Sequence, residues 1–267
     1  MLRAWLALAV LFTGAARGQA PAYSAAGIVN ASDYAPGPFA PNSALSLFGT
    51  SLSLQGPQVV TSGLMQGNFF PTQLAGVSVY LDNVPCPLLY VSAGQINFLV
   101  PATETASSSL PAQVEVVRQG VYGPKVPIYV VAAAPQFFTY SSVYPGYAIA
   151  QDWNAGYATI TPDAPAHAGD VVILYAVGLG AVTPATSSGE LAPYPSPIIQ
   201  ASWATLTVTL NGVALAPSAI LYAGLSPGSA GLYQINVILP ANPGADPVLQ
   251  VSIGGQLSTA ACQLAVR

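Results

Sequence analysis

Few side chains in this sequence could do covalent chemistry. Residues 224–228 read GLSPG and match the G-x-S-x-G pattern of a hydrolase nucleophile elbow. An elbow uses the backbone N–H of the residue after the serine to stabilise the oxyanion, and Pro227 has no N–H to donate. The single histidine, His167, precedes Ser226, whereas hydrolases of this class have histidine last. We therefore expect no enzyme; a hydrolase is a remote alternative that would need two acids brought together by distant loops.

The sequence also lacks the usual metal and cofactor motifs. One histidine and two cysteines cannot supply three or four zinc ligands at the usual spacings. The nine acidic residues are scattered, so calcium could bind only if distant loops gathered them. No glycine-rich phosphate loop opens a helix. We expect no metal and no cofactor.

Aromatic side chains are concentrated between residues 137 and 157, and exposed rings of this kind stack on sugars or anchor protein interfaces. Trp153 lies in a predicted hairpin tip and is the residue we most expect to face solvent. Tyr147 and Tyr157 are further candidates for ligand contact. The alternative is that the phenylalanines of this segment pack at a domain junction and its tyrosines cover the edge of a sheet.

The composition excludes further classes of function. Only 5 of 267 residues are Lys or Arg, and charged residues make up 5% of the chain, against about 25% in typical domains. Nucleic-acid binding requires a basic surface, so we expect none. The hydrophobic fraction of 52% is enough for a substantial core. Low surface charge also predicts some self-association.

The N-terminus has the composition of a secretory signal peptide, with Arg3, an apolar run and small residues near a cleavage site. Cleavage after Gly18 or after Ala20 would satisfy the small-residue rule, and both stay open. No later stretch is apolar enough for a membrane span. We expect a protein that is secreted or held in the cell envelope, with no membrane span once the signal is removed.

Short runs of β-branched and aromatic residues between turns predict an all-β protein. Helical periodicity is nearly absent, because proline and glycine interrupt almost every window of about twelve residues. The predicted strands include 44–48, 77–81, 113–117, 171–175, 206–210 and 248–253.

The sequence repeats itself once, and this predicts two domains. In both halves a strand runs into a two-residue turn, which is Asp82-Asn83 in the first half and Asn211-Gly212 in the second. The matched segments, in the same order, are 47–48 and 174–175, 79–84 and 208–213, 89–90 and 221–222, 95–97 and 234–236. Duplicated folding units produce such ordered matches. We expect a signal peptide over 1–20 and antiparallel β-sandwiches over 21–133 and 134–267.

Cys86 and Cys262 fall in different halves of the repeat. In an oxidising compartment they could form a disulfide between the domains, provided that their Cα atoms come within about 7 Å. Alternation along the last strand places Cys262 on the core face with Leu264 and Val266. A bridge and two free thiols both stay open, and we favour free thiols with at least Cys262 buried.

Several long motifs resemble the Solibacter-type uncharacterised C-terminal domain family. They are GIVNASDYAP at 27–36, FGTSL at 48–52, PLLYVSAGQINFLVP at 87–101, GDVVILYAVGLGAVTP at 169–184 and YAGLSPGSAGLYQINVILP at 222–240. The resemblance covers essentially the whole chain after the signal peptide. It implies two tandem immunoglobulin-like sandwiches, similar to IPT/TIG modules, in exported bacterial proteins, and it supplies no catalytic or binding residues.

These observations predict an exported, non-enzymatic β-sandwich protein that acts in adhesion, scaffolding or protein interaction. A sandwich presents loops at its ends and strand edges at its sides, so it can bind a partner without any catalytic group. The alternative is a carbohydrate-binding module that uses the aromatic segment 137–157. The partner is therefore expected to be a protein or a glycan.

Overall fold

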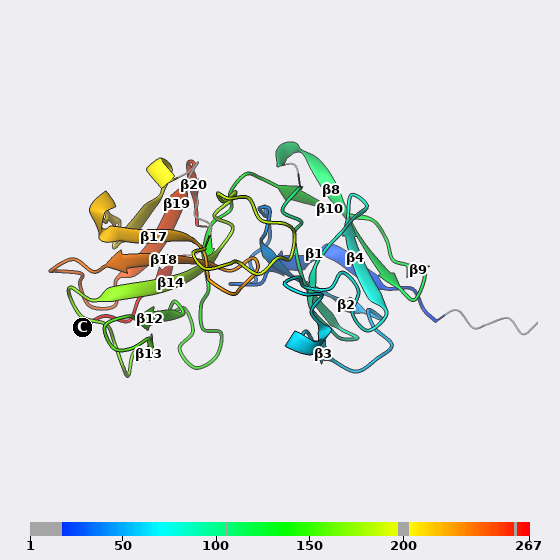
Figure 1. Ribbon diagram of the computed structural model, residues 1–267, viewed down its shortest axis with the longest axis horizontal. Helices are drawn as coiled ribbons and strands as arrows, with labels where there is room; N and C mark the ends of the chain where they lie inside the picture. Colours follow the sequence, from blue (N-terminus) through cyan, green and yellow to red (C-terminus); the bar gives the residue numbers. More distant parts are fainter. Residues whose placement is uncertain (1–17, 105, 197–202, 259–260) are drawn as a thin grey trace, which may run out of the picture.

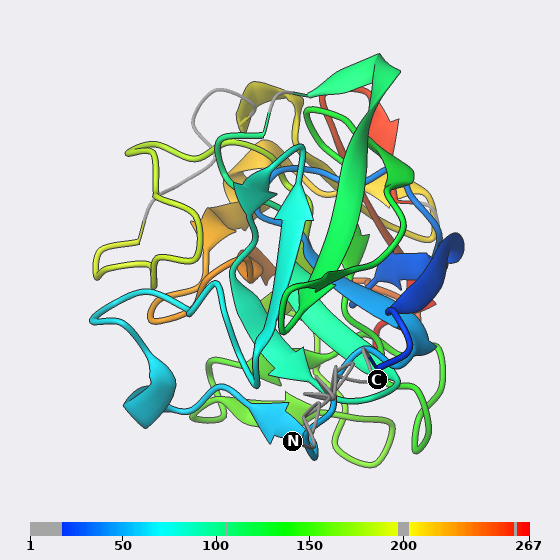
Figure 2. The same cartoon turned by 90° about the vertical axis from the view of Figure 1, so that its right-hand side faces the viewer.

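A computed structural model describes residues 18–104, 106–196, 203–258 and 261–267. The signal peptide predicted from residues 1–20 lies almost entirely outside this part of the chain. The described residues form four antiparallel sheets, arranged as two sandwiches that follow one another along the long axis of the molecule (Figure 1). In the view along that axis the first sandwich lies in front of the second (Figure 2). The predicted all-β class is confirmed.

The first sandwich consists of two sheets and a short 3-10 helix, η1 (Ser62–Leu64). Sheet 1A has the strand order β1 (Ala22–Asn30), β2 (Ala44–Thr50), β7 (Gln95–Leu99), β6 (Leu88–Val91) and β3 (Gln58–Val59). Sheet 1B has the order β10 (Val126–Val130), β8 (Ser107–Arg118), β4 (Val77–Leu81) and β5 (Val84–Pro85), with β9 (Val121–Tyr122) also paired to β8.

The second sandwich repeats this plan. Sheet 2A has the order β13 (Ala158–Ile160), β12 (Ala150–Asp152), β14 (Val171–Val177), β18 (Tyr233–Ile238) and β17 (Ile220–Leu225), with β11 (Gln136–Phe137) paired to β14. Sheet 2B has the order β16 (Val213–Ala214), β15 (Thr207–Leu210), β19 (Val248–Ile253) and β20 (Gln256–Leu257), with β21 (Cys262–Gln263) paired to β19. The 3-10 helices η2 (Trp203–Thr205) and η3 (Pro217–Ala219) flank β15 and β17.

Each sandwich has its own hydrophobic core, because alternate residues of each strand point between its two sheets. On β7 the core residues are Ile96 and Phe98, and on β18 they are Tyr233, Ile235 and Val237. The residues between these positions are partly exposed on the outer faces. Val130 belongs to the first core and Ala133 to the second, so the chain passes from one core to the other at residues 131–132, next to the boundary predicted after residue 133.

The two predicted hairpin turns are equivalent in detail. Asp82 and Asn83 have φ of 46° and 68°, and Asn211 and Gly212 have φ of 51° and 78°. Positive φ at both central residues is the requirement of the tight turn that suits a twisted hairpin. The Asp82 side chain accepts a hydrogen bond from Gln113 N at 2.8 Å, and the Asn211 side chain accepts one from Val248 N at 2.9 Å. The internal repeat therefore extends to side-chain contacts.

The two sandwiches meet through a small apolar cluster. Ala44 and Leu99, on the outer face of sheet 1A, pack with Val177 on sheet 2A and with the partly buried Phe138. Phe138 thus lies at the junction, as the alternative interpretation of the aromatic segment predicted. Phe137 does not, since alternation turns it into the core of the second sandwich.

A buried tyrosine and a crossing loop add hydrogen bonds near this junction. The Tyr233 hydroxyl donates to Gly180 O at 2.6 Å, and a hydrogen bond with Asn42 of the first sandwich moderates the pKa of Tyr233, which burial raises strongly. Phe70 N, in the segment between η1 and β4, donates to Gly189 O, in the segment that follows β14, at 2.9 Å. Backbone bonds between the sandwiches hold them in a defined relation.

Arg118 is a buried charged residue of the first sandwich. Its guanidinium donates to Gln19 O at 2.6 Å and to Ser51 O. These bonds tie the start of the described chain to the turn that follows β2. Among the described residues, no helix is long and apolar enough to cross a bilayer.

Candidate functional site

Trp153 and Tyr157 form an exposed aromatic pair on the turn between β12 and β13, residues 153–157. Their ring centroids are 5.1 Å apart, with the planes inclined by 59°. The two residues are 51% and 50% exposed. The predicted hairpin tip is present, and Trp153 faces solvent on it. The structure therefore brings two of the three predicted contact residues together.

Hydrogen bonds fix the backbone of this turn. The Asp152 carboxylate accepts from Asn154 N at 2.8 Å and from Ala155 N at 3.2 Å, while Tyr157 N donates to Asp152 O at 2.8 Å. The Asn154 side chain accepts from Val171 N at 2.7 Å, which ties the turn to β14. Tyr157 has a φ of 67°, in the left-handed region that side chains larger than glycine rarely adopt.

The aromatic pair adjoins a row of polar side chains on the outer face of sheet 2A. The Tyr175 hydroxyl donates to the Gln151 amide oxygen, and the Gln151 amide nitrogen donates to Tyr157 O at 3.1 Å. Burial raises the pKa of Tyr175, and the charge of the Tyr157 phenolate adds a smaller effect, as expected for neighbouring hydroxyls. The turn and the sheet face therefore form one surface.

Two further amides continue this row on β18. Gln234 lies opposite Tyr175 in the strand register, and its amide nitrogen donates to the Asn236 side-chain oxygen at 3.2 Å. Sequence reasoning did not assign these amides to a surface. The available signal was the Gln-x-Asn spacing, which places both side chains on one face of a strand.

Tyr147, the third predicted contact residue, has a different environment. It is partly buried against the second core, and its backbone forms a bridge with Gln263. Burial is the first cause that raises its pKa, and the Asp246 carboxylate is the second. Tyr147 therefore serves packing more than ligand contact.

A polar depression of about 460 Å³ lies beside β12 and β13. Asp152, Asn154, His167 and Asp170 contribute to its lining. The Asp170 carboxylate accepts from His167 N at 2.7 Å and lies 3.6 Å from the ring nitrogen Nδ1 of the exposed His167. Both carboxylates already bind backbone N–H groups. Within the described ranges, no group of three or more His, Cys, Asp or Glu side chains converges to hold a metal ion.

Ser226 is not part of a nucleophile elbow. It lies between two strands, β17 and β18, rather than between a strand and a helix. The residue is buried, and its hydroxyl donates to the Gln234 amide oxygen at 2.9 Å. Its role is to orient Gln234 on the outer face of sheet 2A.

Cys86 and Cys262 are both free and buried, each in the core of a different sandwich. Burial raises the pKa of both thiols, to about 12 for Cys262, so each stays protonated at neutral pH. The structure contains the free state that the sequence favoured, and the predicted core position of Cys262 is confirmed. The disulfide would require sulfurs from two separate cores to meet.

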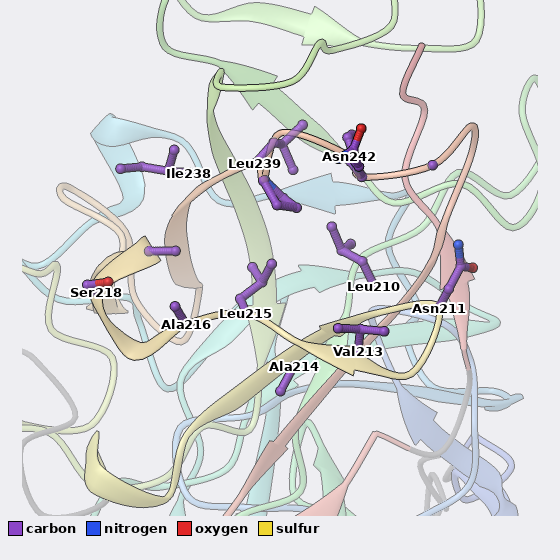
Figure 3. A pocket seen from close by; sticks show the side chains of 14 residues that line it. Leu210, Asn211, Val213, Ala214, Leu215, Ala216, Ser218, Ile238, Leu239 and Asn242 are labelled. Atoms are coloured by element: carbon purple, nitrogen blue, oxygen red, sulfur yellow. The ribbon is translucent and has the colours of Figure 1, made fainter.

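An apolar groove of about 530 Å³ lies between the β15–β16 hairpin, η3 and the segment after β18. Leu210, Leu215 and Leu239 occupy its middle (Figure 3). Asn211 is one of its few polar lining residues, and its side-chain oxygen already binds the backbone. The groove offers apolar contact and no reactive group.

Residues 45–128 match the IPT/TIG domain family. The match covers most of the first sandwich and supports the immunoglobulin-like fold that the sequence predicted. The narrower Solibacter-type family stays a prediction. No sequence among curated proteins matches the chain.

The chain has low similarity to several solved structures. SGBP-B from a complex xyloglucan utilization locus in Bacteroides uniformis has 10% identity and a TM-score of 0.26, over 92% of this chain and 50% of that one. Surface glycan-binding protein PbSGBP-B from Prevotella bryantii has 11% identity and a TM-score of 0.27, over 92% of this chain and 42% of that one. The plexin A4 extracellular region has 11% identity and a TM-score of 0.25, over 86% of this chain and 15% of that one. The chain spans half or less of each, and scores this low carry no information on ligands.

Proposed function

We propose that this protein is an exported, non-enzymatic binding module that contacts a protein or glycan partner through the β12–β13 turn and the outer face of sheet 2A. The observation that carries the proposal is the exposed Trp153–Tyr157 pair on a turn held by hydrogen bonds. Large aromatic rings supply contact area at low entropic cost, and a turn that is already ordered loses little freedom on binding.

The chemistry of the surrounding groups supports binding over catalysis. A nucleophile needs an adjacent base, and a glycosidase needs two carboxylates that face the substrate. Ser226 instead donates to the Gln234 amide, and the two carboxylates beside the turn, Asp152 and Asp170, accept from the backbone of their own loops.

The composition of the N-terminus supports export, either into the medium or to the cell envelope. N-terminal sequencing of protein recovered from the envelope fraction and the medium tests this. A start at Gln19 or Pro21 would identify which of the two cleavage sites is used. An intact Met1 in protein found only inside the cell would contradict export. Light scattering across a concentration series tests self-association.

Co-sedimentation with an envelope fraction from the source organism tests the binding surface. The variant Trp153→Ser with Tyr157→Asn should lower the retained fraction about tenfold or more, since truncating a central aromatic residue costs about 2 kcal/mol. Tyr122→Asn with Tyr129→Ser is the matched control, because both of its tyrosines are exposed on sheet 1B. Equal retention of the two variants would place the binding surface elsewhere.

A further inference from the structure

The first sandwich has an aromatic surface at the position equivalent to the β12–β13 turn. Tyr34 and Phe48 lie with ring centroids 6.0 Å apart and planes inclined by 46°. They are 52% and 39% exposed. Tyr34 belongs to the turn after β1, residues 31–35, and Phe48 belongs to β2. Neither residue was predicted from the sequence as a candidate for binding.

Strand register establishes that the two turns are equivalent. Asn30 ends β1 opposite Leu45, and Asp152 ends β12 opposite Val172. Leu45 and Val172 are corresponding residues, since each lies two positions before a matched segment of the repeat, 47–48 or 174–175. Asn30 and Asp152 therefore occupy the same place in the two sandwiches.

The hydrogen bonds of the two turns agree as well. The Asn30 side chain accepts from Ser32 N at 3.2 Å, as the Asp152 side chain does from Asn154 N. Tyr34 N donates to Asn30 O at 2.9 Å, and Tyr157 N donates to Asp152 O at 2.8 Å. The turns differ in length by one residue, and each presents a tyrosine that is bonded in the same way.

Both tyrosines have left-handed backbone conformations, with φ of 59° at Tyr34 and 67° at Tyr157. This conformation is unfavourable for a residue with a Cβ atom, and a bulky side chain seldom adopts it without a reason. Each ring is about half exposed, so burial does not explain the strain. Strained exposed residues at equivalent positions indicate a surface function.

The amide row is also present twice. Phe48 lies opposite Gln95, whose amide nitrogen donates to the Asn97 side-chain oxygen at 2.8 Å. Tyr175 lies opposite Gln234, which donates to Asn236 in the same way. Each sandwich thus has exposed rings next to a hydrogen-bonded Gln–Asn pair on the outer face of one sheet.

We propose that the surface formed by Tyr34, Phe48, Gln95 and Asn97 is a second binding site, and that both sites take segments of a neutral polysaccharide. The inference rests on the proposed function and names its ligand class. Aromatic rings stack on the apolar faces of sugar rings. Side-chain amides both donate and accept, as adjacent sugar hydroxyls require.

Charge and duplication favour this ligand over others. The strands of sheet 1A contain no charged residue, and those of sheet 2A contain only Asp152, whose carboxylate is occupied by backbone N–H groups. An anionic polymer would find no basic side chain on these strands, and a cationic polymer would find only the Asp152 carboxylate. Two equivalent sites on one chain suit a ligand that repeats its own chemistry, because binding at one site raises the effective concentration of the polymer at the other.

Affinity electrophoresis and calorimetry test the proposal. The probes are soluble mixed-linkage β-glucan, galactomannan and arabinoxylan, with polygalacturonate as the charged comparison and the matching neutral hexasaccharides for stoichiometry. The site variants are Tyr34→Asn with Phe48→Ser and Trp153→Ser with Tyr157→Asn. Asparagine accepts a left-handed backbone, so these changes preserve the turns. Tyr122→Asn with Tyr129→Ser is again the control.

We expect at least one neutral polymer to retard the protein and the hexasaccharide to bind at two sites per chain. Each site variant should bind one hexasaccharide and lose about tenfold or more in affinity for the polymer. Combining both should abolish retardation, and the control should match the original protein.

Two results would overturn the inference while the proposed function stands. One is a stoichiometry of one hexasaccharide that the Tyr34 variant leaves unchanged, which would remove the second site. The other is retardation by no neutral polymer while the Trp153 variant still loses envelope binding, which would assign the surface to a protein ligand. Envelope binding that survives in the Trp153 variant would instead contradict the proposed function.

Discussion

The turns that carry Tyr34 and Tyr157 have the same backbone bonds and almost unrelated sequences. The first reads NASDYA and the second reads DWNAGYA. The first pairs its tyrosine with Phe48, and the second pairs its tyrosine with Trp153 and adds the hydroxyl of Tyr175. The second surface therefore offers two further polar groups, the Tyr175 hydroxyl and the Trp153 indole N–H. The difference teaches that the geometry of the duplicated unit persisted while its residues diverged.

The cores provide the largest test of whether the two sandwiches are equivalent. Leu81 and Leu210 occupy matched strand ends in the two cores and are nearly or fully buried. Leu81→Ala and Leu210→Ala should each lower the free energy of unfolding by about 2–5 kcal/mol, through lost burial and a residual cavity. Hydrogen exchange by mass spectrometry should locate the loss of protection mainly in the sandwich that carries the change. Equal losses in both sandwiches would show that they unfold as one unit.

Tyr233 tests the buried hydrogen bonds of the second sandwich that lie near the junction. Tyr233→Phe removes the donor to Gly180 O and leaves a buried carbonyl without its partner. We expect the free energy of unfolding to fall by about 1–3 kcal/mol, measured by urea denaturation. Tyr122→Phe, on an exposed edge, should change it little. A Tyr233 variant as stable as the original protein would contradict this role.

The two buried thiols predict a loss of stability at alkaline pH. The pKa of Cys262 in the folded protein is about 12, above the value of about 8.5 expected for an unfolded chain. The unfolded state therefore loses its proton first as the pH rises. The contribution of this thiol is fully present below about pH 8.5 and is lost progressively above it, by roughly 2 kcal/mol at pH 10.

Urea denaturation at pH 7 and pH 10 measures this effect. The variant Cys262→Ala should lose less stability between these pH values than the original protein, and Cys86→Ala should behave in the same way because burial also raises the pKa of Cys86. Identical losses in all three proteins would show that the thiols ionise equally in the folded and unfolded states.

The smallest expected effect concerns the strained tyrosines. Tyr34→Asn and Tyr157→Asn should each raise the free energy of unfolding by about 0.5 kcal/mol, because asparagine accepts the left-handed conformation at lower cost. Tyr122→Asn should show no gain, since its backbone is an ordinary strand. Thermal unfolding measures all three. A loss of stability in one turn variant and a gain in the other would break the equivalence of the two surfaces.

Much of the fold could be predicted from the sequence. The structure contains the predicted strands Val77–Leu81 and Val248–Ile253 with the same bounds. Apolar residues alternate along both segments and turn-forming residues flank them, so the pattern fits a strand in one position only. The exposure of Trp153 followed from its place in a hairpin tip. The predicted position of Phe137 at the junction was wrong. Neighbouring residues of a strand point to opposite faces, so Phe137 faces the core of the second sandwich while Phe138 faces the junction.

The aromatic surface of the first sandwich could not be found in this way. Tyr34 and Phe48 are separated by a turn and part of a strand, and only the pairing of β1 with β2 brings their rings together. The left-handed tyrosines also leave no signal, since neither is a glycine or an asparagine.

By itself the sequence determined the strand content, the duplication and the small number of charged residues, because these depend on residue type and spacing along the chain. The tertiary structure decided which side chains share a surface. Cross-strand register and turn conformation set those contacts, and they depend on residues far apart in the chain.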